Sequence, residues 1–342
     1  MKYKYIMGVD MSKSWFHYCL KNKDHEIIQE GEIPNTIGDI YTFISHLEEL
    51  LGKQELTDIV LCMEYTGIYV KHLVRCWLSR GGQLSMVHAS KLSEQLSGKQ
   101  GWLEKSDALD ARRLAEYGIR FQDQLKPAGL KDETLDKLQA MQRQRERILK
   151  AINLLEVPVK ESKGFDNTSI YTALENNQAN SILALRQDLK KIEKALEQVI
   201  NEDPLLKHLF KLIKSVEGVG AVTAREIIIS TQAFTKFNPG QAKKYARYVG
   251  VVPRQWSSGS SIRKKNKTSK RRHKKLNSLL TNGVISLIGT KNELAIFYQR
   301  KRQEGKEHMS VVNAIRNKII LRIFAVVRNG VMYEKNLNHS LI

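Results

Sequence analysis

Residues 3–34 read YKYIMGVDMSKSWFHYCLKNKDHEIIQEGEIP, and their pattern points to β-structure near the start of the chain. Three segments rich in apolar, β-branched and aromatic residues follow one another, separated by short polar stretches. Asn-Lys-Asp-His at 22–25 is typical of a turn. We therefore expect three consecutive strands.

The segments that follow alternate between helical and strand patterns. Helices are indicated by apolar residues at helical spacing, and buried strands by short apolar runs. This order, three strands and then helix, strand, helix, strand and helix, predicts an α/β domain with a mixed sheet over residues 1–125. The expected elements after the three strands are a helix at 36–51, a strand at 58–67, a helix at 69–82, a strand at 83–90 and a helix at 103–120.

Residues 126–203 are predicted to form two long helices of coiled-coil type. Apolar residues recur at heptad spacing, which places them on one narrow seam of each helix. Pro158 and Gly164 are expected to break the pattern between the helices. The sequence leaves open whether they pair within one chain or between chains as a dimerisation element. The seam residues are Leu138, Met141, Ile148, Ile152 and Leu155, with Arg145 as an exception, and then Ile182, Leu185, Leu189, Ile192, Leu196 and Val199.

The formal net charge is +20, and the positive charge is unevenly placed. No acidic residue lies between Glu226 and Glu293, whereas nine Lys and Arg residues lie in SIRKKNKTSKRRHKK at 261–275. A charge run is often only a solvated face or a disordered tail. An internal basic run between apolar segments instead favours a polyanion. Nucleic acid fits better than an anionic membrane, because the run lacks the apolar face of an interfacial helix.

Residues 204–342 are expected to form a mostly α-helical domain that binds nucleic acid. Gly218-Val219-Gly220 is typical of a helix-hairpin-helix turn, which presents backbone N–H groups to a phosphate. The expected nucleic-acid contacts are Gly218, Gly220, Arg254, Arg263, Lys264, Lys265, Lys267, Lys270, Arg271, Arg272, Lys274 and Lys275.

The composition disfavours several classes of protein. No apolar run reaches the roughly 18 residues of a membrane span, and the first residues lead into a strand pattern rather than a signal peptide. Cys19, Cys62 and Cys76 have no metal-ligand spacing, which favours buried, reduced thiols. The chain lacks the Gly-x-x-x-x-Gly-Lys-Ser/Thr phosphate loop of ATP-binding proteins. We therefore expect a cytoplasmic, nucleoid-associated protein that has no membrane partner and uses no ATP.

Four acidic residues in the first domain are placed where they could converge. Asp10 and Glu64 each follow an apolar run, and Asp107 and Asp110 share one face of a helix start. Each alone has an ordinary explanation, as a turn residue or as a charge favoured by the helix dipole. Four carboxylates at one point would need a cation, and hard oxygen ligands select Mg²⁺ or Mn²⁺. Spacing alone leaves this metal site a hypothesis.

An ordered set of motifs resembles the insertion-sequence one-hundred-ten (IS110) family of transposases along nearly the whole chain. The motifs are GVDMSK at 8–13, MEYTG at 63–67, KSDALDA at 105–111 and YVGVVPRQWSSG at 248–259. The resemblance implies a RuvC-like domain with the ribonuclease H fold at 1–125. A coiled-coil insertion at 126–203 and a C-terminal transposase domain at 204–342 are implied to follow.

The same resemblance implies the site residues. The family's catalytic serine falls on Ser258 in a Ser/Gly loop, and Ser257 is a one-residue alternative. This chain has Ser106 where family members commonly have Thr, and it lacks the Gly that they have after Lys270-Arg271. The family's Asp-Glu-Asp-Asp tetrad falls on Asp10, Glu64, Asp107 and Asp110.

The resemblance further implies an RNA-guided DNA recombinase. Members use the serine to form a covalent phosphoserine link to DNA, assisted by a Mg²⁺-bound tetrad. The implied partners are donor and target DNA, a structured noncoding guide RNA and further copies of the chain, from dimer to tetramer. The alternatives are a metal-dependent Holliday-junction nuclease of RuvC type without serine chemistry, a non-catalytic nucleic-acid-binding protein and, remotely, a sugar-kinase-like protein.

Overall fold

The computed structural model divides the chain into two compact units, Met1–Lys131 and Asp132–Ile342, which are described separately. It describes residues 3–52, 56–64, 67–88, 92, 106–129, 132–165, 167–252, 254–258, 262–267 and 272–334. Of residues 254–258 and 262–267 it describes the backbone.

The first unit contains a five-stranded mixed sheet in the order β3-β2-β1-β4-β5. The first three strands form an antiparallel meander, and β4 and β5 continue the sheet parallel to β1. The α/β domain with a mixed sheet expected from the sequence is therefore confirmed. The strands are β1 (Tyr5–Met11), β2 (Trp15–Asn22), β3 (Ile27–Pro34), β4 (Ile59–Glu64) and β5 (Gln83–Val87).

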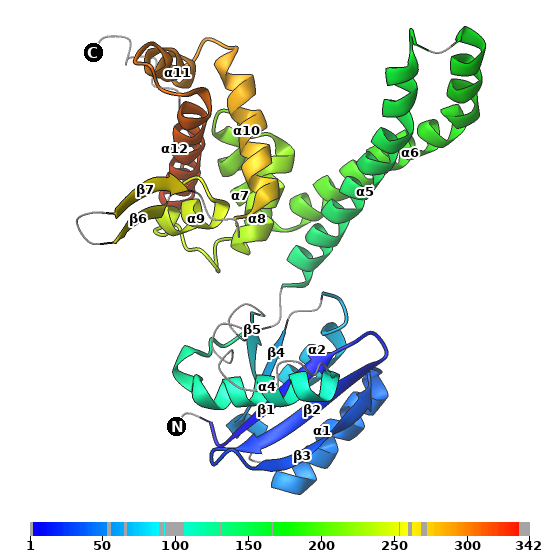
Figure 1. Ribbon diagram of the computed structural model, residues 1–342, viewed down its shortest axis with the longest axis vertical. Coiled ribbons are helices and arrows are strands. Elements are labelled where there is room, and N and C mark those ends of the chain that lie inside the picture. The colour runs from blue at the N-terminus through cyan, green and yellow to red at the C-terminus, as the bar shows by residue number, and fades with distance from the viewer. Residues whose placement is uncertain are drawn as a thin grey trace. The chain divides into compact units, whose positions relative to one another are not determined.

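Helices cover both faces of this sheet. Met7 and Val9 of β1 face α1 (Ile37–Leu51) and α2 (Lys71–Ser79), with which they share one buried apolar cluster. The other face is covered by α4 (Asp107–Arg120), which crosses β1 and β2 (Figure 1). Because side chains alternate along a strand, Gly8 and Asp10 lie on the opposite face of β1, toward α4. Two short 3₁₀ helices, η1 (Leu56–Asp58) and η2 (Gln122–Gln124), complete the unit.

The second unit begins with two long helices, α5 (Glu133–Ser162) and α6 (Thr168–Glu202), which pack against each other as a hairpin (Figure 1). An ion pair between Arg145 Nη2 and Glu193 Oε1, at 2.8 Å, joins them at the exceptional seam position. The expected break at Pro158 is wrong, because α5 continues to Ser162. Proline removes the hydrogen bond to the carbonyl of Leu154, and this residue is 75% exposed, so that water can replace the bond.

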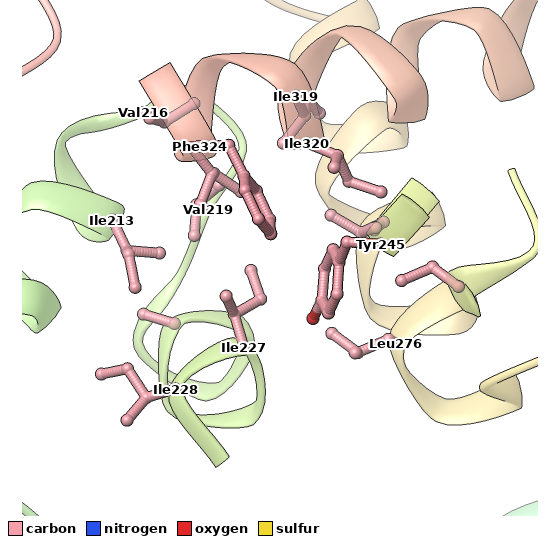
Figure 2. Close-up of a cluster of buried hydrophobic side chains, with 14 of the residues drawn as sticks. Ile213, Val216, Val219, Ile227, Ile228, Tyr245, Leu276, Ile319, Ile320 and Phe324 are labelled. Carbon is pink, nitrogen blue, oxygen red and sulfur yellow. The ribbon is translucent and has the colours of Figure 1, made fainter. Parts of the chain in front are cut away.

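The rest of the second unit is a helical bundle around α12. This helix packs against α7, α9, α10 and α11. Figure 2 shows Ile227 of α8, Tyr245 of α9 and Phe324 of α12 converging in the core, and the two aromatic rings lie 5.1 Å apart. The bundle helices are α7 (Pro204–Ser215), α8 (Ala221–Thr231), α9 (Ala242–Val249), α10 (Lys274–Ile288), α11 (Glu293–Gln303) and α12 (His308–Asn329).

A two-stranded antiparallel ribbon lies between α9 and α10 in the chain. It consists of β6 (Arg254–Ser258) and β7 (Ile262–Lys267). The expected Ser/Gly loop is thus in part a strand, because 254–258 pair with the basic segment instead of remaining irregular. None of the helices in the described part of the chain is both long enough and apolar enough to cross a membrane.

Candidate active site

Two neighbouring parallel strands place Asp10 and Glu64 at the same edge of the sheet. The register of β1 and β4 pairs Val9 with Met63, and the next residue of each strand is one of the two acids. Glu64 shares its strand face with Cys62, which packs in the cluster under α4. Both acidic side chains therefore belong to the face that α4 covers.

Close packing on Gly8 brings α4 over these strands. A Cβ atom on Gly8 would lie 2.1 Å from the carbonyl oxygen of Ala111 and 2.3 Å from the nitrogen of Ala115. Only glycine allows the helix backbone to approach the strand so closely. Gly8 is two residues before Asp10, so the contact fixes the start of α4 near the strand ends.

The first turn of α4 supplies the other two acids, Asp107 and Asp110. Ser106 caps this helix, because its hydroxyl oxygen accepts a hydrogen bond from the N–H of Leu109 at 3.2 Å. Ser106 therefore acts as a normal N-cap where the family commonly has threonine. Capping and dipole effects also favour the two acids here, so both explanations of the pair are compatible with the structure.

Electrostatic coupling links the four acids. Burial raises the pKa of Asp10 above its usual value, and the negative charges of Asp107, Asp110 and Glu64 raise it further, while a backbone hydrogen bond from Met11 opposes them. One oxygen of Asp110 accepts a hydrogen bond from Arg113 Nη1 at 2.8 Å. A carboxylate whose ionisation is opposed by burial and by neighbouring negative charges is a typical setting for a cation.

The four side chains are the right type of ligand for a hard divalent cation, but they are not arranged as a complete coordination sphere. All four groups are carboxylates, the ligands that Mg²⁺ and Mn²⁺ take. Among the described residues, no three Asp, Glu, His or Cys side chains are arranged so that they could hold a metal ion as they stand. Arg113 occupies one oxygen of Asp110, so ligation by that oxygen would require the arginine to move.

Ser257 and Ser258 lie at the end of β6 in the second unit. In the ribbon, Ser257 is paired with Arg263 and Ser258 with Ile262, so a basic residue lies directly across from Ser257. The structure describes the backbone at both serines, and their side-chain positions lie outside the description.

The predicted basic contacts fall into three groups. Arg272 and Lys274 are exposed near the start of α10, whereas Lys275 forms ion pairs with Glu226 of α8 and Glu146 of α5. Lys275 thus ties three helices together and is not an unneutralised charge. The side chains of the ribbon residues Arg254, Arg263, Lys264, Lys265 and Lys267, and the whole of Lys270 and Arg271, lie outside the description.

Half-buried His273 and buried Glu226 form a polar contact that the sequence did not predict. His273 Nδ1 accepts a hydrogen bond from the N–H of Leu276 and so caps α10, and its Nε2 lies 3.6 Å from Glu226. Its backbone N–H donates to the carbonyl of Tyr248 at 3.1 Å. Burial lowers the pKa of His273, and the negative charge of Glu226 opposes this effect. The available signal was one acid in the otherwise apolar segment EIIIS at 226–230.

Two family models match the chain. Residues 7–156 match the DEDD type of IS110 transposase, and residues 210–299 match the transposases of the IS116/IS110/IS902 family. The first range contains Asp10, Glu64 and the start of α4, and the second contains the β6–β7 ribbon. Together the two ranges cover well over half of the chain.

Curated relatives align over the same extent. The pilin gene-inverting protein of Moraxella bovis is 26% identical over 347 positions, which cover 98% of this chain and 99% of the relative. That of Moraxella lacunata is 24% identical over 336 positions, with the same coverage. An uncharacterized 43.6 kDa protein of insertion element IS110 from Streptomyces coelicolor is 24% identical over 159 residues, covering 46% of this chain and 38% of that protein. The chain therefore belongs to the IS110 family of transposases, which are enzymes that act on DNA.

Proposed function

We propose that this chain is the DNA recombinase of a mobile insertion sequence and that it cuts and rejoins strands through a covalent phosphoserine link. The observation that carries the proposal is that β1, β4 and the first turn of α4 bring Asp10, Glu64 and the helical acid pair to one edge of the sheet. The DEDD type of the matched family supports a ribonuclease H-like, RuvC-like fold for this unit. The gene-inverting relatives support strand rejoining, because inversion requires it.

A divalent cation, Mg²⁺ or Mn²⁺, would be held by the four acids Asp10, Glu64, Asp107 and Asp110. When bound, it would stabilise charge on the attacking and leaving oxygens of a phosphate. The acids would hold this cation for the scissile phosphate, and Gly8 and Ser106 keep the helical pair in place. Arg113 would exchange its contact with Asp110 for another partner on loading.

Ser258 would supply the nucleophile, with Ser257 as the alternative. Its hydroxyl oxygen attacks phosphorus, the bond from phosphorus to the leaving DNA oxygen breaks, the serine loses its proton and the leaving oxygen gains one. One phosphoester bond replaces another, so a DNA hydroxyl can later reverse the step without ATP. A serine hydroxyl is a weak nucleophile at its free pKa, and the basic residues of the ribbon support the reaction by attracting the developing negative charge.

Donor and target DNA are the proposed substrates, and the basic segment at 261–275 is the proposed contact to their phosphates. A structured noncoding guide RNA would supply sequence specificity by base pairing, which leaves little trace in the protein. A dimer or tetramer, in which one copy supplies the acids and another supplies the serine, is part of the proposal.

A strand-exchange assay on purified protein with Mg²⁺, guide RNA and both DNAs tests the proposal. Ser258→Ala should abolish rejoined products, and Ser257→Ala should retain them. Asp10→Asn should also abolish the products, because it removes one of the proposed metal ligands. If Ser258→Ala and Ser257→Ala both cut junction DNA at the wild-type rate while Asp10→Asn does not, the chain is instead a RuvC-type nuclease.

A further inference from the structure

A pocket of about 400 Å³ lies between the glycine turn that precedes α8 and one face of α10. The turn and the first residues of α8 form one wall, and α10 forms the other. Asn282 and Ser286 are exposed at its rim, whereas Thr223 is buried in its wall. Its lining includes Gly218, Gly220, Thr223, Asn282, Gly283 and Ser286.

Two glycines let the turn rest directly on α10. Gly218 has a φ of +79°, and a Cβ atom there would lie 2.6 Å from Leu287 Cδ1. A Cβ atom on Gly283 would lie 2.2 Å from the carbonyl oxygen of Gly218. Gly220 is different, because a Cβ atom there would meet nothing within 4 Å. The turn and α10 are therefore in close backbone contact, whereas the space beside Gly220 is open.

The first turn of α8 presents hydrogen-bond donors without acceptors. Gly220 is the N-cap and has no side chain with which to cap the helix. The N–H groups of Ala221, Val222 and Thr223 make no hydrogen bond to any described part of the chain. Such groups, together with the helix dipole, attract an anion.

The hydroxyl of Thr223 is an independent sign of a ligand. Thr223 is only 5% exposed and lines the pocket, yet its hydroxyl has no hydrogen-bond partner among the described residues. The oxygen itself is not fully shielded from solvent, so a molecule that enters the pocket can form a hydrogen bond with it.

The rim adds one more neutral donor. The Asn282 amide makes no hydrogen bond within the described residues, whereas the Ser286 hydroxyl already donates to the carbonyl of Gly283 at 2.8 Å. No Lys or Arg is found among the described lining residues, and the neighbouring Glu217 is acidic. The pocket therefore attracts an anion through dipoles and hydrogen bonds and not through positive side chains.

We infer that this pocket binds one backbone phosphate of a nucleic-acid strand through the first-turn N–H groups of α8, the Thr223 hydroxyl and the Asn282 amide. The inference rests on the proposed function, which makes nucleic acid the ligand, and it adds Thr223 and Asn282 to the glycines expected from the sequence. Neutral donors displace no counterions. The contact therefore adds affinity for every sequence without increasing the salt dependence of binding.

The test compares binding of a random-sequence duplex DNA and of a hairpin RNA to the full-length chain at several salt concentrations. Thr223→Val removes the hydroxyl and keeps the branched shape, and Thr223→Ser keeps the hydroxyl. Ala221→Pro removes one N–H, which the first position of a helix tolerates, and the extended Gly220 before it, with ψ of 171°, accepts a following proline. Ala221→Ser is its control, because it keeps the N–H.

Thr223→Val and Ala221→Pro should each weaken binding roughly tenfold, as expected for one hydrogen bond to a charged acceptor, with an unchanged salt slope and near-normal binding by both controls. An effect on DNA alone or on RNA alone identifies the source of the phosphate. Wild-type affinity of both variants for both probes overturns the inference, and so does a reduced salt slope. The proposed function is tested separately by Arg263→Ala/Lys264→Ala, because wild-type binding by this variant would count against the basic segment and leave the pocket untouched.

Discussion

Replacing Gly8 with alanine should test how the acids are positioned. The added Cβ atom would lie 2.1 Å from a backbone oxygen of α4 and 2.3 Å from a backbone nitrogen, and ordinary contact begins at 3.4 Å. The helix must therefore retreat by about 1 Å, and overpacking of this kind costs about 1–3 kcal/mol of unfolding free energy. The retreat also moves Asp107 and Asp110 away from Asp10. A displacement of about 1 Å at a reacting centre costs roughly 100-fold in rate.

The assay is single-turnover DNA cleavage in Mg²⁺, measured well below the melting temperature of each variant, with thermal unfolding recorded in parallel. Gly38→Ala is the matched control, because Gly38 lies in α1 with nothing within 4 Å of an added Cβ atom. It should leave the cleavage rate unchanged. Wild-type cleavage and wild-type stability of Gly8→Ala would refute the claim that this contact positions the helical acids.

Three further predictions concern stability. Burial raises the pKa of Glu116, but hydrogen bonds from His25, Lys21 and Arg120 outweigh this effect and lower the pKa to about 2. Glu116→Gln should therefore cost at most about 3 kcal/mol of unfolding free energy at pH 7, and the loss should shrink as the pH falls from about 4.5 to about 2 in acid titrations of unfolding. A loss that does not depend on pH would contradict this. Because burial and neighbouring acids raise the pKa of Asp10, the ionised carboxylate destabilises the fold above that pKa. Asp10→Asn should therefore have a higher melting temperature than wild type at pH 7 in the presence of a chelator. Added Mg²⁺ should raise the melting temperature of wild type more than that of the variant, and an equal rise in both would count against a metal site there. Pro158→Ala should stabilise α5 by up to about 3 kcal/mol in denaturant unfolding, and a destabilised variant would show that the proline is needed in the helix.

The local patterns in the sequence predicted the elements of the first unit well. Apolar runs bounded by turn residues predicted the strands, and apolar residues at helical spacing predicted α1, α2 and α4. These patterns can be read from the sequence because they involve residues that are close along the chain. The ribbon was not predictable in this way. RQWSS and IRKKNK have no regular apolar alternation, and their strands exist through pairing with each other.

The acidic residues of the candidate site were predictable from the sequence, but the strand order and helix packing that position them were not. Asp10 and Glu64 follow apolar runs, which marks them as strand-end acids, but only the strand order shows that β1 and β4 are neighbours. The close packing on Gly8 depends on a helix about 100 residues away in sequence. The ion pairs of Lys275 could not be predicted from the basic run, because its partners Glu146 and Glu226 are equally remote in sequence.

The most direct test of the central claim is to trap the reaction on DNA and map the linkage. Wild-type protein is incubated with Mg²⁺, guide RNA and a donor DNA that carries a nick beside the scissile phosphate, denatured and digested, and the modified peptide is sequenced by mass spectrometry. The account predicts a nucleotide attached to Ser258, absent from Ser258→Ala and present in Ser257→Ala. Cleaved DNA with no covalent adduct, or an adduct on a residue other than Ser258 or Ser257, would contradict it.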